Sequence, residues 1–413
     1  MSFPQTEKSF AMGERELVCM VAMLQALQAV AIDAMLPALG VMSHDLGVGD
    51  SNQRQFVIGV FLLASGLGSL FPGAFADRFG RRPVMLACLA GYLVFSLAAA
   101  LVRDFNALLL MRFCAGFTTA GLVVTSSAII RDRFSGDRMA RLQSMVGVVF
   151  MAVPMIAPSL GQGVLLFAGW RWIFGIMAGL GAVVSIWVYF RLPETLHPEY
   201  RQSISLGPVF SNMGTALFNR SAVGYVFGMA FVQGALFAYI NSCQQLVAEH
   251  FGAGEAFPLI FAAMALAMAA ANLTNSRIVE RFGARRVSHT AVLAYIGLAA
   301  LQLYLASSGH QTIWQFVPVM TLNLCLMGFI GANFSSIALQ PFARIAGAAA
   351  SLQLFVRMVL ASVIGALVGQ AYDGTAVPLA LTLCVVGVLT LLLVLFSERG
   401  RLFRRLHGQV AQA

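Results

Sequence analysis

Charge is scarce in this chain of 413 residues, because charged side chains make up only 10% of it and hydrophobic ones 59%. The mean hydropathy is +0.82. This balance leaves too little polar surface for a soluble domain and is typical of a protein that crosses a membrane many times. The formal net charge of +9 does not indicate a nucleic-acid partner, because the basic residues lie in short loops and not on one continuous face.

Cysteine and histidine are also few and scattered. All six cysteines lie in apolar stretches without a CxxC pair, so neither a disulfide nor a metal site is predicted. The six histidines fall in loops, in the tail or at a helix end, which argues against an intramembrane enzyme. No GxxxxGKS/T loop for ATP phosphates occurs. We therefore expect no enzyme activity, no metal and no bound cofactor.

Apolar stretches long enough to cross a bilayer follow one another along the chain. The N-terminus lacks a signal-peptide pattern, so we expect the first of them to be retained. Basic residues gather in the loops on one side, and the other side receives only Arg54, Arg103 and Arg171. Because basic loops stay inside, both termini are predicted to be cytoplasmic. We predict an all-α integral membrane protein with twelve transmembrane helices, at 17–39, 55–76, 83–102, 107–130, 142–168, 173–191, 223–247, 256–276, 287–307, 314–338, 347–372 and 377–396.

A short motif occurs twice, about half the chain apart. DRFGRR at 77–82 follows the second predicted helix, and ERFGARR at 280–286 follows the eighth. The one long polar connection, at 192–222, separates the first six predicted helices from the last six. We therefore predict two related halves, with an N-terminal six-helix bundle at 1–191, a cytoplasmic linker at 192–222, and a C-terminal six-helix bundle with a basic cytoplasmic tail at 223–413. Such repeats place a substrate site between the halves near the midplane.

Asp33 is the one acid that we place inside a predicted membrane helix. A charge at the bilayer centre costs roughly 2.5–3.5 kcal/mol on insertion scales, so an acid there indicates function. Ala29, one turn earlier, leaves room beside the carboxyl, and Pro37, one turn later, bends or loosens the helix end. The alternative interpretation is a buried acid that only joins two helices.

Several segments resemble the major facilitator superfamily. GAFADRFGRRP at 73–83 is similar to the signature loop of that family, RFCAG at 112–116 to its Arg-x-x-x-Gly motif, and 147–163 to its Gly/Pro antiporter motif. IDAMLPAL at 32–39, RD at 131–132, NSR at 275–277 and the run at 346–365 resemble the bicyclomycin-resistance (Bcr/CflA) subfamily of multidrug efflux proteins. The resemblance covers essentially the whole chain and implies two pseudo-symmetric six-helix bundles in the bacterial inner (cytoplasmic) membrane. This fold forms its cavity within a single chain, so we expect a monomer.

The resemblance also implies a function. Proteins of this subfamily are drug:proton antiporters, so the expected activity is export of small, mostly apolar drugs or toxic compounds by alternating access. The proton gradient drives it, and the partners are the drug, protons and the lipid bilayer. The alternative is an exporter or symporter of a metabolite or siderophore, which a denser set of polar cavity residues would favour.

Asp33 and Arg112 are the predicted proton-coupling residues. They lie at similar depth in helices that line the central cavity of the resembled fold, with Asp33 as the proton site and Arg112 as its electrostatic partner. The alternative is a permanent ion pair that holds two helices together. Some related exporters carry a second acid at the position of Gln25, so this chain is expected to have a single membrane acid.

Polar and aromatic residues of the helices are candidates for the substrate cavity. Arg357 lies mid-helix with no acid predicted at its depth, and either attracts an anionic or electron-rich substrate or binds backbone carbonyls and partners across the halves. The candidates are Gln25, Gln233, Phe237, Tyr239, Asn241, Asn333 and Arg357.

Two motifs are predicted to control movement. In the first, Asp77 is expected to accept hydrogen bonds from backbone N–H groups at a helix N-terminus and to pair with arginines of its loop, which closes the inner side. The alternative for this loop is simple topology charge. Its residues are Gly73, Asp77, Arg78, Gly80, Arg81 and Arg82, and Ser276 replaces the first glycine in the second copy. The second motif, Gly147, Pro154, Pro158 and Gly161, is expected to bend its helix and allow close approach to neighbours.

Overall fold

The computed structural model describes residues 12–134, 136–196, 199, 211, 213–215 and 217–403, and within them every regular element is a helix. Eleven of these helices are long and apolar enough to cross a membrane, and a bent pair brings the number to twelve. The predicted fold class is confirmed. The main helices are α1 (Glu14–Asp33), α2 (Leu39–Asp45), α3 (Phe56–Gly68), α4 (Pro72–Phe79), α5 (Arg81–Leu101), α6 (Phe105–Arg133), α7 (Gly136–Phe167), α8 (Arg171–Arg191), α10 (Arg220–Gln244), α11 (Phe257–Phe282), α12 (Ala284–Ser307), α13 (Ile313–Leu339), α14 (Ala346–Gln370) and α15 (Val377–Ser397).

Two of the predicted spans are interrupted. The first stops being an α-helix at Asp33 and continues through a 3₁₀ turn at Leu36–Ala38 into α2. Pro37 has no N–H for the carbonyl of Asp33, and its ring crowds that carbonyl, so the helix ends there. The span predicted at 55–76 is present as a bent pair of helices. The chain bends by 46° between α3 and α4, where Pro72 begins the new helix.

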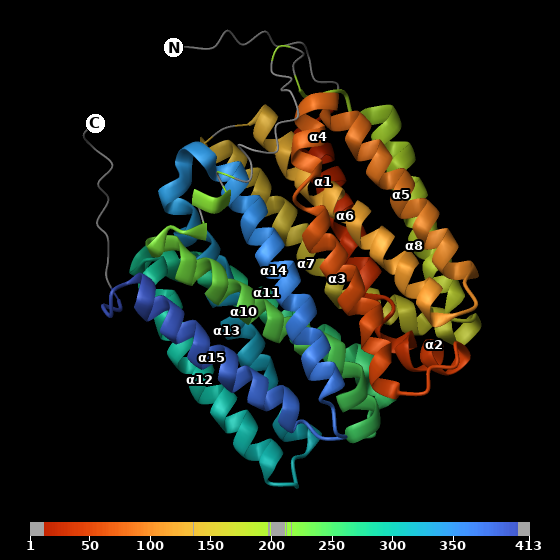
Figure 1. Cartoon of the computed structure of the whole chain (residues 1–413), viewed down its shortest axis with the longest axis vertical. Coiled ribbons are helices and arrows are strands. Elements are labelled where there is room, and N and C mark those ends of the chain that lie inside the picture. The colour runs from red at the N-terminus through yellow and green to blue at the C-terminus, as the bar shows by residue number, and fades with distance from the viewer. Residues whose placement is uncertain are drawn as a thin grey trace.

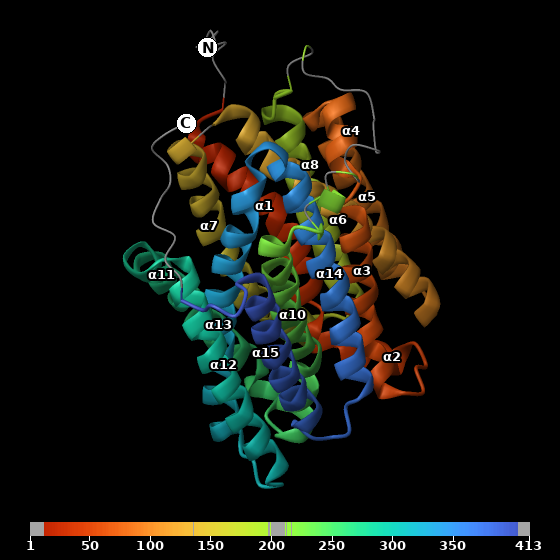
Figure 2. The same ribbon diagram turned by 60° about the vertical axis from the view of Figure 1, so that its left-hand side comes forward.

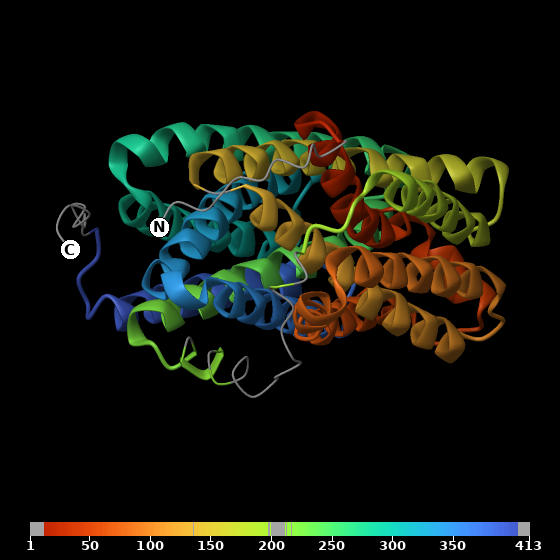
Figure 3. The ribbon, with the colours of Figure 1, turned by 90° about the horizontal axis from the view of Figure 1, so that it is seen from above.

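Figure 1 shows the helices of the N-terminal half, in red to yellow-green, beside those of the C-terminal half, in green to blue. Two contacts join the halves most extensively, α3 with α14 and α7 with α11. Figure 3 shows α7, in gold, reaching alongside the green-to-teal helices of the second half. Much of the predicted linker at 192–222 lies outside the described residues. The division of the chain into bundles at 1–191 and 223–413 stays a prediction.

The two ends of the bundle differ in charge. We call the end that carries the α4–α5 and α11–α12 loops, with Arg81, Arg82, Arg285 and Arg286, the basic end. The opposite end, with α2 and the turn between α12 and α13, is the distal end. Figure 2 shows α4 and α2 at these opposite ends.

The halves are bonded to each other at the distal end. Arg54 forms an ion pair with Glu249 at 2.6 Å, and Gln55 donates to the Gln245 side chain. Asn52 Nδ2 donates to the Tyr372 carbonyl at 3.1 Å. The hydrogen bonds and ion pairs that join two described residues across the halves lie at or near this end. At the basic end the halves instead face a cavity of about 380 Å³. Among the described residues, the halves are thus bonded at the distal end and separated by a cavity near the basic end.

Replacing Arg54 with Gln is expected to favour opening at the distal end. The Arg54 side chain is only 5% exposed, and a hydrogen bond between charged groups contributes about 1.5–3 kcal/mol. Its loss should raise the population of the distally open state about tenfold or more. Spin labels at the exposed positions 106 and 308, in a background without native cysteines, report the separation of the halves.

Glu249→Gln should give the same shift, and the double variant no more than either alone. Arg103→Gln, which changes an exposed distal arginine without an ion pair to any described residue, is the matched control. Unchanged label distances in Arg54→Gln would show that the ion pair does not hold the distal end closed.

Candidate functional site

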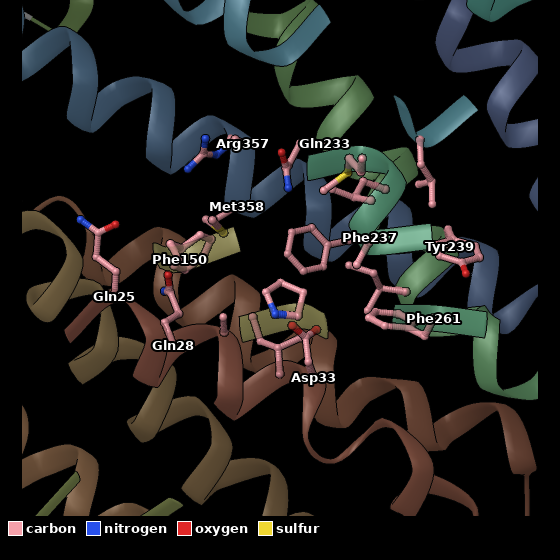
Figure 4. Close-up of a pocket in the computed structure, with 18 of the residues that line it drawn as sticks. Gln25, Gln28, Asp33, Phe150, Gln233, Phe237, Tyr239, Phe261, Arg357 and Met358 are labelled. Atoms are coloured by element: carbon pink, nitrogen blue, oxygen red, sulfur yellow. The ribbon is translucent and has the colours of Figure 1, made fainter. Parts of the chain in front are cut away.

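A cavity of about 390 Å³ lies between the halves, surrounded by α1, α6, α7, α10, α11, α13 and α14. Its walls are mostly apolar and include Phe150, Phe237 and Phe261. Figure 4 shows Gln28 and Asp33 on one side and Gln233 and Arg357 on the other. Its apolar walls with few polar groups are typical of a small-molecule site. No cluster of His, Cys, Asp and Glu suited to a metal occurs among the described residues.

Asp33 is the last residue of α1, and its side chain faces this cavity. The residue is only 5% exposed, and it forms no hydrogen bond or ion pair with any described residue. Ala29, one turn earlier, lines the cavity, as its small side chain predicted. Across the helix break, α7 packs so closely that a Cβ on Gly161 would collide with the Ala34 carbonyl.

Arg112 lies beside α1 but does not bind the Asp33 carboxyl. The guanidinium donates to the Ala31 carbonyl at 2.8 Å and to the Val57 carbonyl at 3.2 Å, and it lies 4.2 Å above the Phe61 ring. Because α1 ends at Asp33, the Ala31 carbonyl lies in the last turn, where carbonyls lack intrahelical partners. The predicted direct pairing is therefore not formed in this structure. Arg112 holds the backbone two residues before the acid instead.

The structure brings most of the predicted cavity residues together. Gln25, Gln233, Phe237, Tyr239 and Arg357 line the same cavity as Asp33. The Tyr239 hydroxyl donates to the sulfur of Met264, another lining residue.

Asn241 and Asn333 lie elsewhere. Asn333 Nδ2 donates to Asn275 Oδ1 at 2.9 Å, and Asn241 is buried against Gly365. A helix presents only some of its polar residues to one cavity, and sequence spacing without known neighbours does not identify that face.

Gln28 is a lining residue that the sequence reasoning missed. Its Nε2 donates to Ser65 Oγ at 2.5 Å. The lining residues of α1 lie at 25, 28, 29, 32 and 33, which is the spacing of one helical face. That spacing would have identified Gln28.

The loop between α4 and α5 is held by acids from three places. Arg81 pairs with Asp77 at 2.5 Å and with Asp132 at 2.7 Å. Glu194 accepts from the backbone N–H groups of Arg81 and Arg82, at 2.9 and 3.2 Å. The predicted pairing of Asp77 with an arginine is formed, and its predicted bond to a helix N-terminus stays a prediction. At the N-terminus of α5 the backbone N–H groups are bound by Glu194, while Asp77, in the last turn of α4, reaches the Arg81 side chain.

The glycines of this loop differ in their constraints. Gly80 has φ +105°, which side chains rarely adopt, and a Cβ there would collide with the Glu194 carboxylate. At Gly73 a Cβ would meet only Val124, at an ordinary 3.9 Å. The Arg82 guanidinium donates to the Tyr189 carbonyl, while Arg78 lies near the Phe79 ring.

The C-terminal half repeats this arrangement with Glu398, directly after its last helix. Arg285 Nε donates to Glu398 at 2.7 Å, and the Tyr225 hydroxyl donates to it at 2.6 Å. Burial acts to raise the pKa of Glu398, but the hydrogen bonds from Tyr225 and Arg285 outweigh it and lower that pKa below its ordinary value. Each half thus has an acid after its sixth helix that fixes its basic loop.

The antiporter-like motif lies on α7. Pro154 and Pro158 are inside this helix, and Pro154 lines the cavity. Gly161 makes the close approach to α1 described above, whereas nothing lies within 4 Å of a Cβ on Gly147.

A family model described as "Major Facilitator Superfamily" matches residues 21–366. The chain belongs to the major facilitator superfamily, and it is a transporter and not an enzyme. Two solved structures share the fold, each with a TM-score of 0.71. They are the human organic anion transporter MFSD10 (19% identity, 94% of this chain and 100% of that chain) and a D-xylose–proton symporter (14% identity, 92% and 95%).

Similar proteins with names point to one subfamily within this superfamily. A "Bicyclomycin resistance protein homolog" of Haemophilus influenzae is 30% identical over 89% of this chain and 92% of its own. The "Multidrug resistance protein MdtL" of Klebsiella pneumoniae is 28% identical (82% and 84%), and the "Chloramphenicol resistance protein" of Pseudomonas aeruginosa is 26% identical (85% and 83%). The resemblance to the bicyclomycin-resistance subfamily of multidrug efflux proteins is confirmed.

Proposed function

We propose that this protein is a proton-coupled antiporter that exports small, mostly apolar drugs or toxic compounds from the cytoplasm. The observation that carries this proposal is Asp33, the one acid among the described lining residues of an otherwise largely apolar cavity between two bundles. The names of the relatives support the export of antibiotics. The protein acts as a monomer and uses the proton gradient without a bound cofactor.

The basic end faces the cytoplasm in this proposal, in a bacterial inner membrane. Positive loops favour the cytoplasmic side, and the short distal loops carry few arginines. The open cavity at the basic end then receives substrate from inside. Opening at the distal end, with closure at the basic loops, releases the substrate outside and admits a proton.

One acid is sufficient for useful export. At about 100 mV, one elementary charge entering the cell supplies roughly 2.3 kcal/mol. Exchanged for a neutral molecule, it sustains about a 50-fold concentration gradient. The pH gradient adds to this.

Proton release from acid-loaded inverted membrane vesicles tests the proposal. A pH-sensitive dye follows the lumen while bicyclomycin, a phenicol, ethidium and tetracycline are added in turn. We expect at least one neutral drug to raise the luminal pH in vesicles that contain the protein and not in vesicles without it. No response to any of the four would contradict drug:proton antiport. Vesicles with Asp33→Asn test the role of the acid.

A further inference from the structure

Two unpaired hydrogen-bond donors lie one turn apart on α14. Gln353 Nε2 and Arg357 Nε are buried and have no partner among the described residues. Gln353 is only 5% exposed, and its other side-chain atom, Oε1, already accepts from Ser335 Oγ at 3.1 Å. Residues four apart face the same side of a helix. A buried donor without an acceptor costs about 1–3 kcal/mol, so this pair calls for an acceptor that the chain does not supply.

Both donors face space between the halves. Gln353 and Arg357 line the cavity at the basic end, and Arg357 also lines the cavity that holds Asp33. Among the described residues, Asp77 is the acid that lines the basic-end cavity, and it is already paired with Arg81. The two donors are therefore available to a guest molecule that brings acceptors.

The opposite side of the Asp33 cavity carries an acceptor that lacks a donor. The Asp33 carboxyl is an acceptor without a donor, and it lies across the cavity from Arg357 (Figure 4). When Asp33 is ionised, as in the substrate-bound state, one acid and one arginine leave the described lining of this cavity without net charge. This favours a neutral guest over an ion of either sign.

We infer that Gln353 and Arg357 bind an acceptor-rich group, such as a sulfonyl, nitro or carbonyl group, on a neutral substrate. The apolar body of that substrate occupies the aromatic cavity, and a hydroxyl or N–H group donates to the Asp33 carboxylate. A hydrogen bond from the substrate stabilises the ionised carboxylate of Asp33 and so weakens its hold on a proton, which is the competition that antiport requires. This inference rests on the proposed function and names the substrate class.

Calorimetry on the full-length protein in nanodiscs tests it with three naphthalenes. The complete probe, 6-(methylsulfonyl)-2-naphthalenemethanol, carries both groups. 2-Naphthalenemethanol lacks the acceptor group, and 2-methyl-6-(methylsulfonyl)naphthalene lacks the donor group. Removing the sulfonyl should weaken binding to the wild type about tenfold or more, as expected for a bond from a charged donor.

Variants of Gln353 and Arg357 test whether the weaker binding without the sulfonyl group comes from α14. In Arg357→Gln and Gln353→Leu the complete probe should bind more weakly, and removing its sulfonyl should then have a much smaller effect. Arg357→Lys keeps the charge and should retain part of the preference. Arg401→Gln, an exposed arginine at the basic end, is the matched control and should bind like the wild type. An equal sulfonyl effect in the wild type and in both α14 variants would overturn the inference.

A second readout separates this site from the antiport proposal. In unbuffered solution with a pH dye, the hydroxyl-bearing probes should release protons on binding and the probe without the hydroxyl should not. Proton release without an effect of Arg357 and Gln353 would overturn the α14 site and leave antiport standing. A sulfonyl preference that depends on Arg357, without proton release, would retain the α14 site and contradict the proton exchange.

Discussion

Vesicles that contain Asp33→Asn should show no drug-triggered rise in luminal pH, at an expression level equal to the wild type. The carboxamide has nearly the shape of the acid but cannot take up and release a proton. Asp33 is the one acid among the described residues that line its cavity, so none of these neighbours replaces it. Because Asp33 forms no hydrogen bond or ion pair with a described residue, the substitution leaves no described side chain without its partner. The pH-dye assay on inverted vesicles measures the effect.

Glu255→Gln makes the same chemical change on an exposed acid of the distal end and should respond like the wild type. Drug binding to Asp33→Asn, measured by calorimetry, should persist for drugs held mainly by the apolar walls. A pH response that survives in Asp33→Asn would assign the proton to another group.

Replacing Arg112 with Leu should cause the largest loss of stability among the site residues. The Arg112 guanidinium is 1% exposed and binds two backbone carbonyls, of Ala31 and Val57. Leucine leaves both carbonyls without these donors, and hydrogen bonds to charged groups contribute about 1.5–3 kcal/mol each. It also removes the contact of the cation with the Phe61 ring. We expect unfolding in detergent to require about 3–5 kcal/mol less than in the wild type.

Arg103→Leu, at an exposed distal position, is the control for a lost positive charge. Arg112→Lys should recover only part of the stability, because a single ammonium group lacks the planar fork of donors. If Arg112→Leu were as stable as the wild type but failed to couple drug to protons, the arginine would act in the proton transfer itself. That outcome would support the predicted electrostatic switch over a structural role.

The sequence predicted the helices and the acid, because both follow from local composition. An apolar run of bilayer length identifies a span, and one carboxyl within such a run identifies Asp33 as exceptional. The end of α1 at Asp33 could also be predicted, because Pro37 lies four residues later and cannot donate to the Asp33 carbonyl. The sequence did not predict which helices pack against each other.

Contacts between distant segments were the part that could not be predicted. Glu194 holds backbone N–H groups of α5 that precede it by more than a hundred residues, and no local pattern links the two. Arg112 was assigned to Asp33 on depth alone, whereas it donates to the Ala31 carbonyl, which has no helical partner because α1 ends at Asp33. Such partners follow from the three-dimensional arrangement and not from spacing along the chain.

The one-sided bonding of the halves has a bioenergetic consequence. In the proposed orientation, with the basic end in the cytoplasm, the distal contacts of Asn52, Arg54 and Gln55 separate the outside from the cavity at the basic end. If protons drive the carrier as proposed, a state open at both ends would conduct them and dissipate their gradient. These few polar contacts, together with the apolar packing around them, would then be the resting barrier to proton leak. Weakening them would cost the cell energy even when no drug is present.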